Sequence, residues 1–371
     1  MSERYIGLMS GTSIDGIDGI IAEFADDRLS RVLGCLHHDY PASLRQRLMA
    51  VSVDQPAITL AEFSALDAAI GDAFAAAALR LIRDSGVDPA SITAIGSHGQ
   101  TLFHDGPKRL SLQMGDASRI AALTGITTIS DFRRLDMALG GQGAPLAPAF
   151  HQALLGDAHE NRCALNLGGI ANITTLHAGG RGPVIGYDTG PANGLMDEWM
   201  LRCTGQPFDD CGRFAASGSP DEAMIAALLA DPYFALPAPK STGRDYFRLD
   251  WALQRHPAML EMPPADVQAS LARVTVRSVA ESVRRTMPDL ARLIVCGGGA
   301  RNAELLRLLG EALPGVAVDT SAAHGLAPDW IEAAAFAWLA MRRMNGQPGN
   351  LPSVTGARRA VSLGAVLLAP Y

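Results

Sequence analysis

Lysine is nearly absent from this chain of 371 residues: only Lys108 and Lys240 occur, and each follows a proline. The Walker A loop needs a lysine directly after a glycine, so P-loop phosphate binding is excluded. No G-x-G-x-x-G pattern occurs either, because the glycines at 297–299 are followed by Asn302 where the third glycine would fall. This disfavours a dinucleotide fingerprint. A bound nucleotide would have to be held in another way.

Long apolar runs and paired cysteines are also missing. The apolar window Ile331–Met341 is short and contains Glu332, whereas a membrane-spanning helix takes about 20 apolar residues. No membrane span is predicted. The five cysteines are scattered without a C-x-x-C pair, so we expect reduced thiols and no zinc or redox site. The N-terminus lacks the basic and apolar segments of a signal peptide, and we expect a cytoplasmic protein.

Positive charge is in short supply too. The chain has 31 basic and 38 acidic residues and a formal net charge of −7, which disfavours nucleic acid and anionic membrane surfaces as partners. Apolar residues make up 48% of the sequence, as expected for a globular protein with a full core. At roughly 150 residues per domain, the length indicates about two domains.

Strands and helices alternate along the sequence, which predicts an α/β fold. Residues 5–9 and 17–24 are expected to form a hairpin around a small polar turn, and residues 164–174 repeat that pattern. A single repeated pattern is explained about equally well by internal duplication and by coincidence. The spacing predicts a helix from a capping box at Thr59 to Gly86.

Further along, a short strand over 92–96 is expected to end at the polar segment 97–101. Glycine-dense residues 140–145 indicate a domain boundary nearby. A strand over 293–296 precedes a helix beginning at Asn302, and a last helix is expected over 329–344.

Three turns rich in small residues follow apolar strands and offer backbone N–H groups for phosphate binding without a lysine. They are the turn after residue 9, the turn at Gly168 and Gly169, and the glycines at 297–299. Each turn alone is explained as well by its geometry, but three together favour anion binding. Asp15 and Asp18 beside the first turn are candidates to hold Mg²⁺ through water, or they simply cap the turn.

Asp188 is the best catalytic candidate, because it ends an apolar strand just before a glycine and a helix start. A carboxylate there can act as a general base. Two other interpretations stay open at this point. One is that Asp188 is a plain helix cap, and the other is that Asp-Thr-Gly belongs to an aspartic protease with Asp319 as its partner. The helical content of the chain argues against the protease. The charged segment from Lys240 is expected to be a solvated loop.

The sequence resembles the anhydro-N-acetylmuramic acid kinases, which belong to the superfamily of sugar kinases, Hsc70 and actin. The resemblance runs along nearly the whole chain, with eight motifs in the family's order. They are GLMSGTSIDGID (7–18), GSHGQT (96–101), SDFR (130–133), GGQGAP (140–145), NLGGIAN (166–172), DTGP (188–191), KSTG (240–243) and GGGARN (297–302).

The resemblance implies an α/β fold of two RNase H-like lobes around a central cleft. Lobe I would comprise residues 1–135 and about 358–371, and lobe II residues 136–357. Asp188 would be the catalytic base, and Thr101, Arg133 and Glu332 would contact the sugar. ATP would be bound by Gly11, Thr12, Ser13, Asp15, Gly16, Asp18, Asn166, Gly168, Gly169, Gly297, Gly298 and Gly299.

The activity that the resemblance implies is ATP- and Mg²⁺-dependent phosphorylation of 1,6-anhydro-N-acetylmuramic acid with opening of its anhydro bridge. The products would be N-acetylmuramate 6-phosphate and ADP, in peptidoglycan recycling and amino-sugar catabolism. The family also implies a homodimer. The alternative is a non-catalytic, nucleotide-dependent module of the actin or Hsc70 kind.

Overall fold

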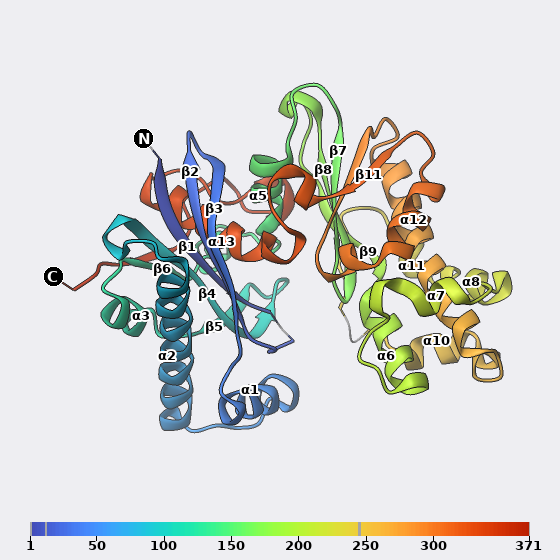
Figure 1. The fold of residues 1–371 in the computed structure, drawn as a ribbon, viewed down its shortest axis with the longest axis horizontal. Helices are drawn as coiled ribbons and strands as arrows, with labels where there is room; N and C mark the ends of the chain where they lie inside the picture. Colours follow the sequence, from blue (N-terminus) through green and yellow to red (C-terminus); the bar gives the residue numbers. More distant parts are fainter. Residues whose placement is uncertain (1, 12, 244–245, 371) are drawn as a thin grey trace. The chain divides into compact units, whose positions relative to one another are not determined.

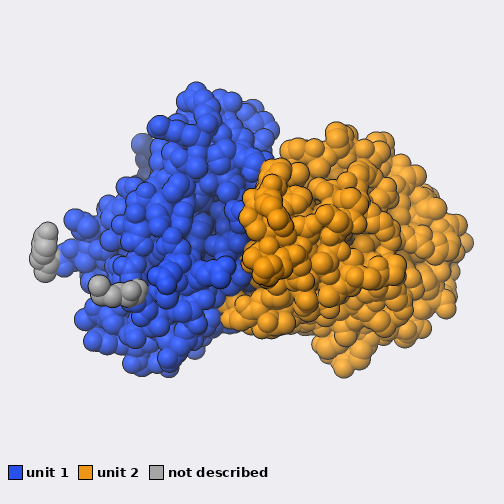
Figure 2. Space-filling model, turned by 90° about the horizontal axis from the view of Figure 1, so that it is seen from above, with its two compact units in different colours: residues 1–154, 330–371 blue, residues 155–329 orange. Residues whose placement is uncertain are grey.

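The computed structural model describes residues 2–11, 13–243 and 246–370. Its contacts divide the chain into two compact units, coloured separately in Figure 2. Unit 1 comprises residues 1–154 and 330–371, and unit 2 comprises residues 155–329. The glycine-dense connection at 140–145 is tied into unit 1, because Gln142 N–H donates to the carbonyl of Thr355 at 2.8 Å. Thr12, one of the residues expected to bind ATP, lies outside the described residues.

Unit 1 is built on a seven-stranded sheet in the order β12-β6-β4-β1-β2-β3, with β5 paired to β4. Strands β1, β2 and β3 form an antiparallel meander, while β4 runs parallel to β1 and β6 parallel to β4. The strands are β1 (Glu3–Ser10), β2 (Ile17–Ala25), β3 (Arg28–His38), β4 (Ile92–Asp105), β5 (Leu110–Met114), β6 (Thr128–Ser130) and β12 (Ala365–Leu367).

Unit 2 repeats this arrangement in a five-stranded sheet, β9-β8-β7-β10-β11. Strands β7, β8 and β9 form the antiparallel meander, and β10 and β11 continue parallel to β7. The strands are β7 (Arg162–Leu167), β8 (Ile170–Leu176), β9 (Gly186–Pro191), β10 (Arg292–Cys296) and β11 (Ala317–Thr320). The same strand order and directions occur in both units, so the expected α/β fold with two RNase H-like lobes is confirmed. The two similar hairpin patterns in the sequence, at residues 5–24 and 164–174, therefore reflect a structural duplication.

The helices of unit 1 cover its sheet, and α13 packs against β1, β2 and β4 (Figure 1). A Cβ atom on Gly7 would lie 1.9 Å from the carbonyl oxygen of Ala333, and one on Gly96 would lie 2.1 Å from that of Phe336. Only glycine therefore lets α13 lie directly on β1 and β4. The unit's helices are α1 (Ala42–Asp54), α2 (Leu60–Ser85), α3 (Ala117–Thr124), α4 (Arg134–Ala138), α5 (Ala147–Leu155, ending at the unit boundary), α13 (Ile331–Met344) and α14 (Pro352–Thr355).

The core of unit 2 gathers around α11, whose buried face includes Val267, Leu271 and Val274. The helices of this unit are α6 (Asn193–Thr204), α7 (Arg213–Ser217), α8 (Glu222–Leu229), α9 (Pro232–Ala235), α10 (Leu249–Arg255), α11 (Pro264–Thr286) and α12 (Ala303–Ala312). Within the ranges described, no helix is long and apolar enough to cross a membrane.

Several local predictions can be compared directly with the structure. Helix α2 begins with the predicted capping box, in which Thr59 accepts from Glu62 N–H and Glu62 accepts from Thr59 N–H, and it ends at Gly86. The strand expected over 92–96 was too short, because β4 continues to Asp105. Its far end pairs with β5, and this antiparallel partner keeps 97–101 inside the strand.

Candidate active site

The first phosphate-loop candidate joins β1 to β2 in unit 1. Ile14 N–H donates to the carbonyl of Gly11 at 3.2 Å, and Arg45 donates to the carbonyl of Ile14 at 2.9 Å. At Gly16, a Cβ atom would lie 2.6 Å from the ring of His37, so glycine is needed for this close approach. The described part of the turn is held from several sides.

Two carboxylates, Asp15 and Asp18, border this turn, as the sequence placed them. Asp18 Oδ1 lies 2.7 Å from His37 Nδ1. The pKa of His37 is lowered by loss of solvation, but its hydrogen bond with Asp18 and the charges of Asp18, Asp15 and Asp39 outweigh this and raise it overall. Among the described residues no three acidic, histidine or cysteine side chains converge as a metal cluster. This donor set suits a cation held through water rather than a fully protein-ligated ion.

Arg133 lies at the end of β6, just before α4. Its Nη1 donates to the carbonyl of Gly143 at 2.8 Å, and its Nη2 lies 2.8 Å from Nε2 of His98 on β4. Loss of solvation lowers the pKa of Arg133 to about 10, with the charge of Glu332 acting in the opposite direction. The guanidinium is therefore still charged at neutral pH.

Glu332 enters the same region from the first turn of α13, which the glycines of β1 and β4 hold against the sheet. Glu332 is exposed as a residue. The protein around its carboxyl group nevertheless reduces the solvation of that group, and this raises its pKa. The charge of Asp18 raises the pKa further, and Arg133 partly offsets this. Unit 1 thus brings together Asp15, Asp18, Arg133 and Glu332.

Thr101, the third expected sugar contact, lies on β4 opposite Gln113 of β5. Gln113 Nε2 donates to Thr101 Oγ1 at 3.2 Å. Because Thr101 Oγ1 accepts this hydrogen bond, its own proton points away from Gln113. The Thr101 hydroxyl can therefore still donate to another group.

The second phosphate-loop candidate is the turn between β7 and β8 in unit 2. The carbonyl of Gly168 accepts from Asn193 N–H at 3.0 Å, and that of Gly169 accepts from the N–H groups of Ala192 and Gly194, each at 3.2 Å. These donors belong to the first turn of α6. The start of α6 therefore fixes the glycine turn.

The triple glycine after β10 meets that same turn. A Cβ on Gly297 would lie 2.3 Å from Asn166 Oδ1, and one on Gly299 would lie 2.5 Å from Cβ of Leu167. Asn166 is also paired with Cys296 across β7 and β10. Unit 2 thus brings together the residues at 166–169 and at 297–299, which are more than 100 positions apart in the chain.

Asp188 lies within β9, opposite Asn172 of β8, and the segment after Lys240 holds it. Its Oδ2 accepts from Thr242 N–H at 2.9 Å and from Ser241 Oγ at 3.1 Å. Loss of solvation raises the pKa of Asp188, and these two hydrogen bonds partly offset the rise. A half-buried carboxylate with a raised pKa and a fixed orientation is suited to accept a proton.

The segment from Lys240 is a loop in which Ser241 and Gly243 are exposed, as expected, and Arg244 and Asp245 lie outside the described residues. Its contacts with the site were not expected. Lys240 Nζ donates to the carbonyl of Tyr233 at 2.9 Å and lies 4.5 Å from the centre of that ring. Tyr233 in turn donates through its hydroxyl to the carbonyl of Asp188 at 2.8 Å. Sequence reasoning missed this because charged loops usually face solvent. The signal in the sequence was that Lys240 follows shortly after the aromatic residues Tyr233 and Phe234.

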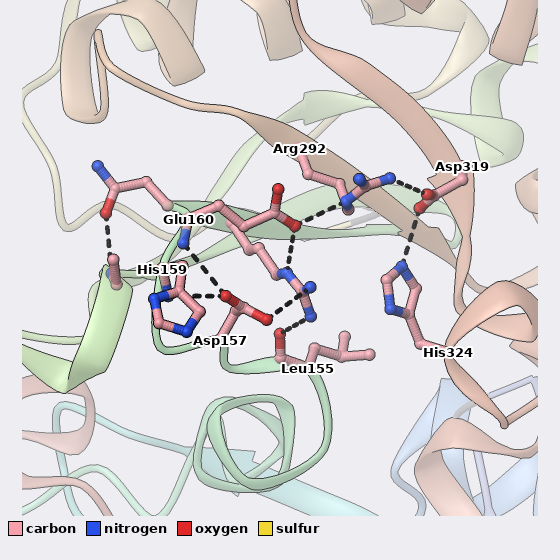
Figure 3. Close-up of polar contacts among 10 residues, drawn as sticks. Leu155, Asp157, His159, Glu160, Arg292, Asp319 and His324 are labelled. Atoms are coloured by element: carbon pink, nitrogen blue, oxygen red, sulfur yellow. Dashed lines mark hydrogen bonds and ion pairs between the residues drawn. The ribbon is translucent and has the colours of Figure 1, made fainter.

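The two competing interpretations of Asp188 can now be judged. Asp188 lies inside a strand five residues before α6, so it is not the cap of that helix. Its supposed protease partner, Asp319, lies on β11, at the opposite edge of the sheet from β9. Four strand spacings separate them, about 19 Å, whereas a protease dyad shares one proton at hydrogen-bonding distance. Figure 3 shows Asp319 instead bound to Arg292 and His324.

That cluster in Figure 3 has a structural role. Arg292 bridges Asp319 of β11 and Glu160, and Arg162 binds Glu160, Asp157 and the carbonyl of Leu155. These contacts tie the starts of β7 and β10 to the chain that enters the sheet of unit 2.

All five cysteines are free, as expected.

Comparison with known proteins places these observations in a family. Residues 3–369 match the family model described as anhydro-N-acetylmuramic acid kinase. A curated protein of that name from Xanthomonas axonopodis pv. citri is 52% identical over 369 residues, covering 98% of each chain. Its namesake from Xanthomonas oryzae pv. oryzae is 51% identical, covering 98% of this chain and 96% of its own. One from Coxiella burnetii is 48% identical, covering 98% and 97%.

Proposed function

The chain belongs to the anhydro-N-acetylmuramic acid kinase family, and from this we propose that it phosphorylates 1,6-anhydro-N-acetylmuramic acid with ATP. The products are N-acetylmuramate 6-phosphate and ADP. The observation that carries the proposal is the family match over residues 3–369, which includes Asp188 and all three glycine-rich turns.

The phosphates of ATP are assigned to backbone N–H groups. In unit 1 the donors are the loop 11–16 with the hydroxyl of Ser13, and in unit 2 they are Gly168 and Gly169. The glycines at 297–299 flank the adenosine. What supports this assignment is that neighbouring residues fix each turn and that its glycines have no side chain to block the approach of an anion, as an anion-binding nest requires.

Mg²⁺ is assigned to Asp15 and Asp18 through water. The two carboxylates fit a hydrated divalent cation, and Asp18 is oriented by His37, whose Nδ1 lies 2.7 Å from Asp18 Oδ1. When bound, the ion neutralises charge on the transferred phosphoryl group.

Asp188 acts as the general base. Its carboxylate takes a proton from water as the water oxygen attacks the anomeric carbon. The bond between that carbon and O6 breaks, and O6 uses the released electron pair to take the γ-phosphoryl group from ATP, which leaves as ADP. O6 needs no acid, because phosphorus replaces the proton. The step parallels inverting glycoside hydrolysis, in which a carboxylate activates water opposite the leaving oxygen.

The sugar is assigned to Thr101, Arg133 and Glu332. Arg133 presents a charged fork of N–H donors, which suits the carboxylate of the substrate's lactyl group. Glu332 accepts hydrogen bonds from hydroxyl or amide groups. What supports this assignment is the electrostatic interaction between Glu332 and Arg133, each of which acts on the pKa of the other.

Two finer features belong to the proposal. The family resemblance favours a homodimer, which sedimentation would test. A cytoplasmic location fits a kinase that uses ATP.

The non-catalytic alternative is not favoured, because Asp188 is retained and held by two hydrogen bonds.

A coupled ADP-release assay across a panel of sugars tests the function. We expect turnover with the 1,6-anhydro sugar and none with glucose or N-acetylglucosamine. Turnover of either hexose without the anhydro sugar would overturn the substrate assignment. ATP hydrolysis that depends on a protein partner and not on any sugar would favour the non-catalytic module.

A further inference from the structure

Two side chains that the proposed function does not use, His98 and Gln100, stand on either side of Gly99 on β4. His98 is 4% exposed and Gln100 is fully buried. Buried polar groups are costly unless they make specific hydrogen bonds. Both make such bonds, and their partners belong to different parts of the candidate site.

His98 faces the proposed sugar side. Its Nε2 lies 2.8 Å from Arg133 Nη2. A guanidinium can only donate, so Nε2 must be the unprotonated ring nitrogen. Burial and the charge of Arg133 keep the pKa of His98 well below its usual value, so the ring stays a neutral acceptor. The ring is also packed against Phe336 of α13, with centroids 4.6 Å apart. His98 therefore fixes the plane of the Arg133 guanidinium.

Gln100 faces the phosphate side. Its Nε2 donates to the carbonyl of Gly11 at 3.1 Å. Its Oε1 lies 2.7 Å from Ser10 Oγ and 3.2 Å from the Tyr40 hydroxyl. Ser10 Oγ also lies 2.7 Å from the carbonyl of Gly16. Gln100 therefore holds Gly11 directly, and it shares the single proton of the Ser10 hydroxyl with the carbonyl of Gly16 at the other end of the turn.

Gly99 makes this arrangement possible. It has φ +71°, and a Cβ atom there would lie 2.6 Å from the carbonyl oxygen of Met114. The pairing of β1 with β4 shifts here, from Leu8 opposite Ser97 to Ser10 opposite Gln100. The extra residue in β4 is a bulge. It brings Gln100 level with Ser10 at the start of the phosphate loop.

We propose that His98 and Gln100 are positioning residues for two different substrates, with His98 orienting Arg133 for the sugar and Gln100 orienting the loop 11–16 for ATP. This inference rests on the proposed function. It assigns separate tasks to two neighbouring residues, so their variants should affect different kinetic constants.

The test is steady-state kinetics of His98→Leu and Gln100→Met with both substrates varied. We expect His98→Leu to raise KM for the anhydro sugar about tenfold, the equivalent of one charge-assisted hydrogen bond, and to leave KM for ATP within about twofold. Gln100→Met should show the reverse. His98→Gln, whose amide oxygen reaches the position of Nε2, should recover part of the sugar affinity. His98→Asn, which is too short to reach Arg133, should behave like His98→Leu and replaces it if that variant does not fold.

His151→Leu is the matched control. His151 is a buried histidine on α5, outside the proposed site, and its loss should lower thermal stability while leaving both KM values unchanged. If both β4 variants raised the two KM values equally, or only lowered stability as the control does, the inference would be overturned while the proposed function stood. A wild-type enzyme that released no ADP with the anhydro sugar would overturn the proposed function and this inference with it.

Discussion

The two units share one strand order but use the ends of their strands differently. In unit 1, the region of the first hairpin turn carries the charged side chains Asp15, Asp18, Arg133 and Glu332. Loss of solvation and the charge of Asp18 raise the pKa of Glu332, and Arg133 partly offsets this. In unit 2, the equivalent turn is formed by glycines fixed through backbone hydrogen bonds, with Asp188 as the proposed catalytic carboxylate. A duplicated scaffold has thus been specialised by its turns rather than by its sheets.

The way helices pack on the two sheets differs as well. In unit 1, α13 lies on glycines, so its backbone approaches β1 and β4 directly and brings Glu332 to the site. In unit 2, α11 packs through valine, alanine and leucine side chains. A side-chain atom added at Gly7 or Gly96 of unit 1 would therefore push a helix off the sheet, whereas the proposed chemistry of unit 2 depends on one carboxylate.

The largest expected effect comes from removing the carboxylate of unit 2. Asp188→Asn should lower kcat by at least about 10²–10⁴-fold, because general-base assistance is lost. ATP binding should persist, since the glycine turns are untouched. Turnover and ATP titration by calorimetry measure the two. Ser241→Ala removes only one hydrogen bond to Asp188. It is the milder control, and its kcat should fall far less.

The pH profile sharpens this assignment. Asp188 must be ionised to act as a base, and its pKa is raised by loss of solvation. The rate should therefore fall with decreasing pH at a higher pH than for an unperturbed aspartate. An acid limb at the ordinary aspartate value would contradict the burial argument.

Gly96→Ala tests the close packing of unit 1. The added Cβ would lie 2.1 Å from a carbonyl oxygen of α13, so α13 or β4 has to move. We expect a loss of about 3 kcal/mol in the free energy of unfolding. Gly310→Ala in α12 of unit 2 is the matched control, because no atom lies within 4 Å of its Cβ. It should be neutral or slightly stabilising. Equal losses in both variants would contradict the comparison.

Acid should weaken unit 1 through its buried histidines. Burial lowers the pKa of His151 to about 4, so the unfolded chain binds the proton more readily than the folded one. This stability is fully present above pH 6.5 and is lost as the pH falls toward 4. We expect His151 alone to lower the free energy of unfolding by about 2 kcal/mol between pH 7 and pH 5. His98 should act in the same direction. Denaturant titrations at both pH values measure this, and His151→Gln should reduce the slope.

The smallest effect is expected at a helix cap far from the turns. Thr59→Ala removes the capping box of α2 and should cost about 1 kcal/mol without changing kcat. A thermal melt and an activity assay suffice. A change in kcat would show that α2 is linked to the site in a way that its contacts do not explain.

Much of this could be predicted from the sequence because it depends on local patterns. The capping box at Thr59, the hairpins and the glycine turns are each visible within a few residues. The convergence of 166–169 with 297–299 was accessible only through family resemblance, since strand pairing between β7 and β10 is not local.

What could not be predicted depends on tertiary contacts. The extension of β4 to Asp105 requires β5 as a partner, and the holding of Asp188 by Thr242 joins residues 54 positions apart. The roles of His98 and Gln100 follow from a bulge at Gly99 that no local pattern signals.

The central claim, that Asp188 activates water while O6 takes the phosphoryl group, is tested most directly by running the reaction in ¹⁸O-labelled water. The account predicts one labelled oxygen on the anomeric hydroxyl of the product and none on its phosphate. Label in the phosphate, or an unlabelled anomeric hydroxyl before exchange with solvent, would contradict it.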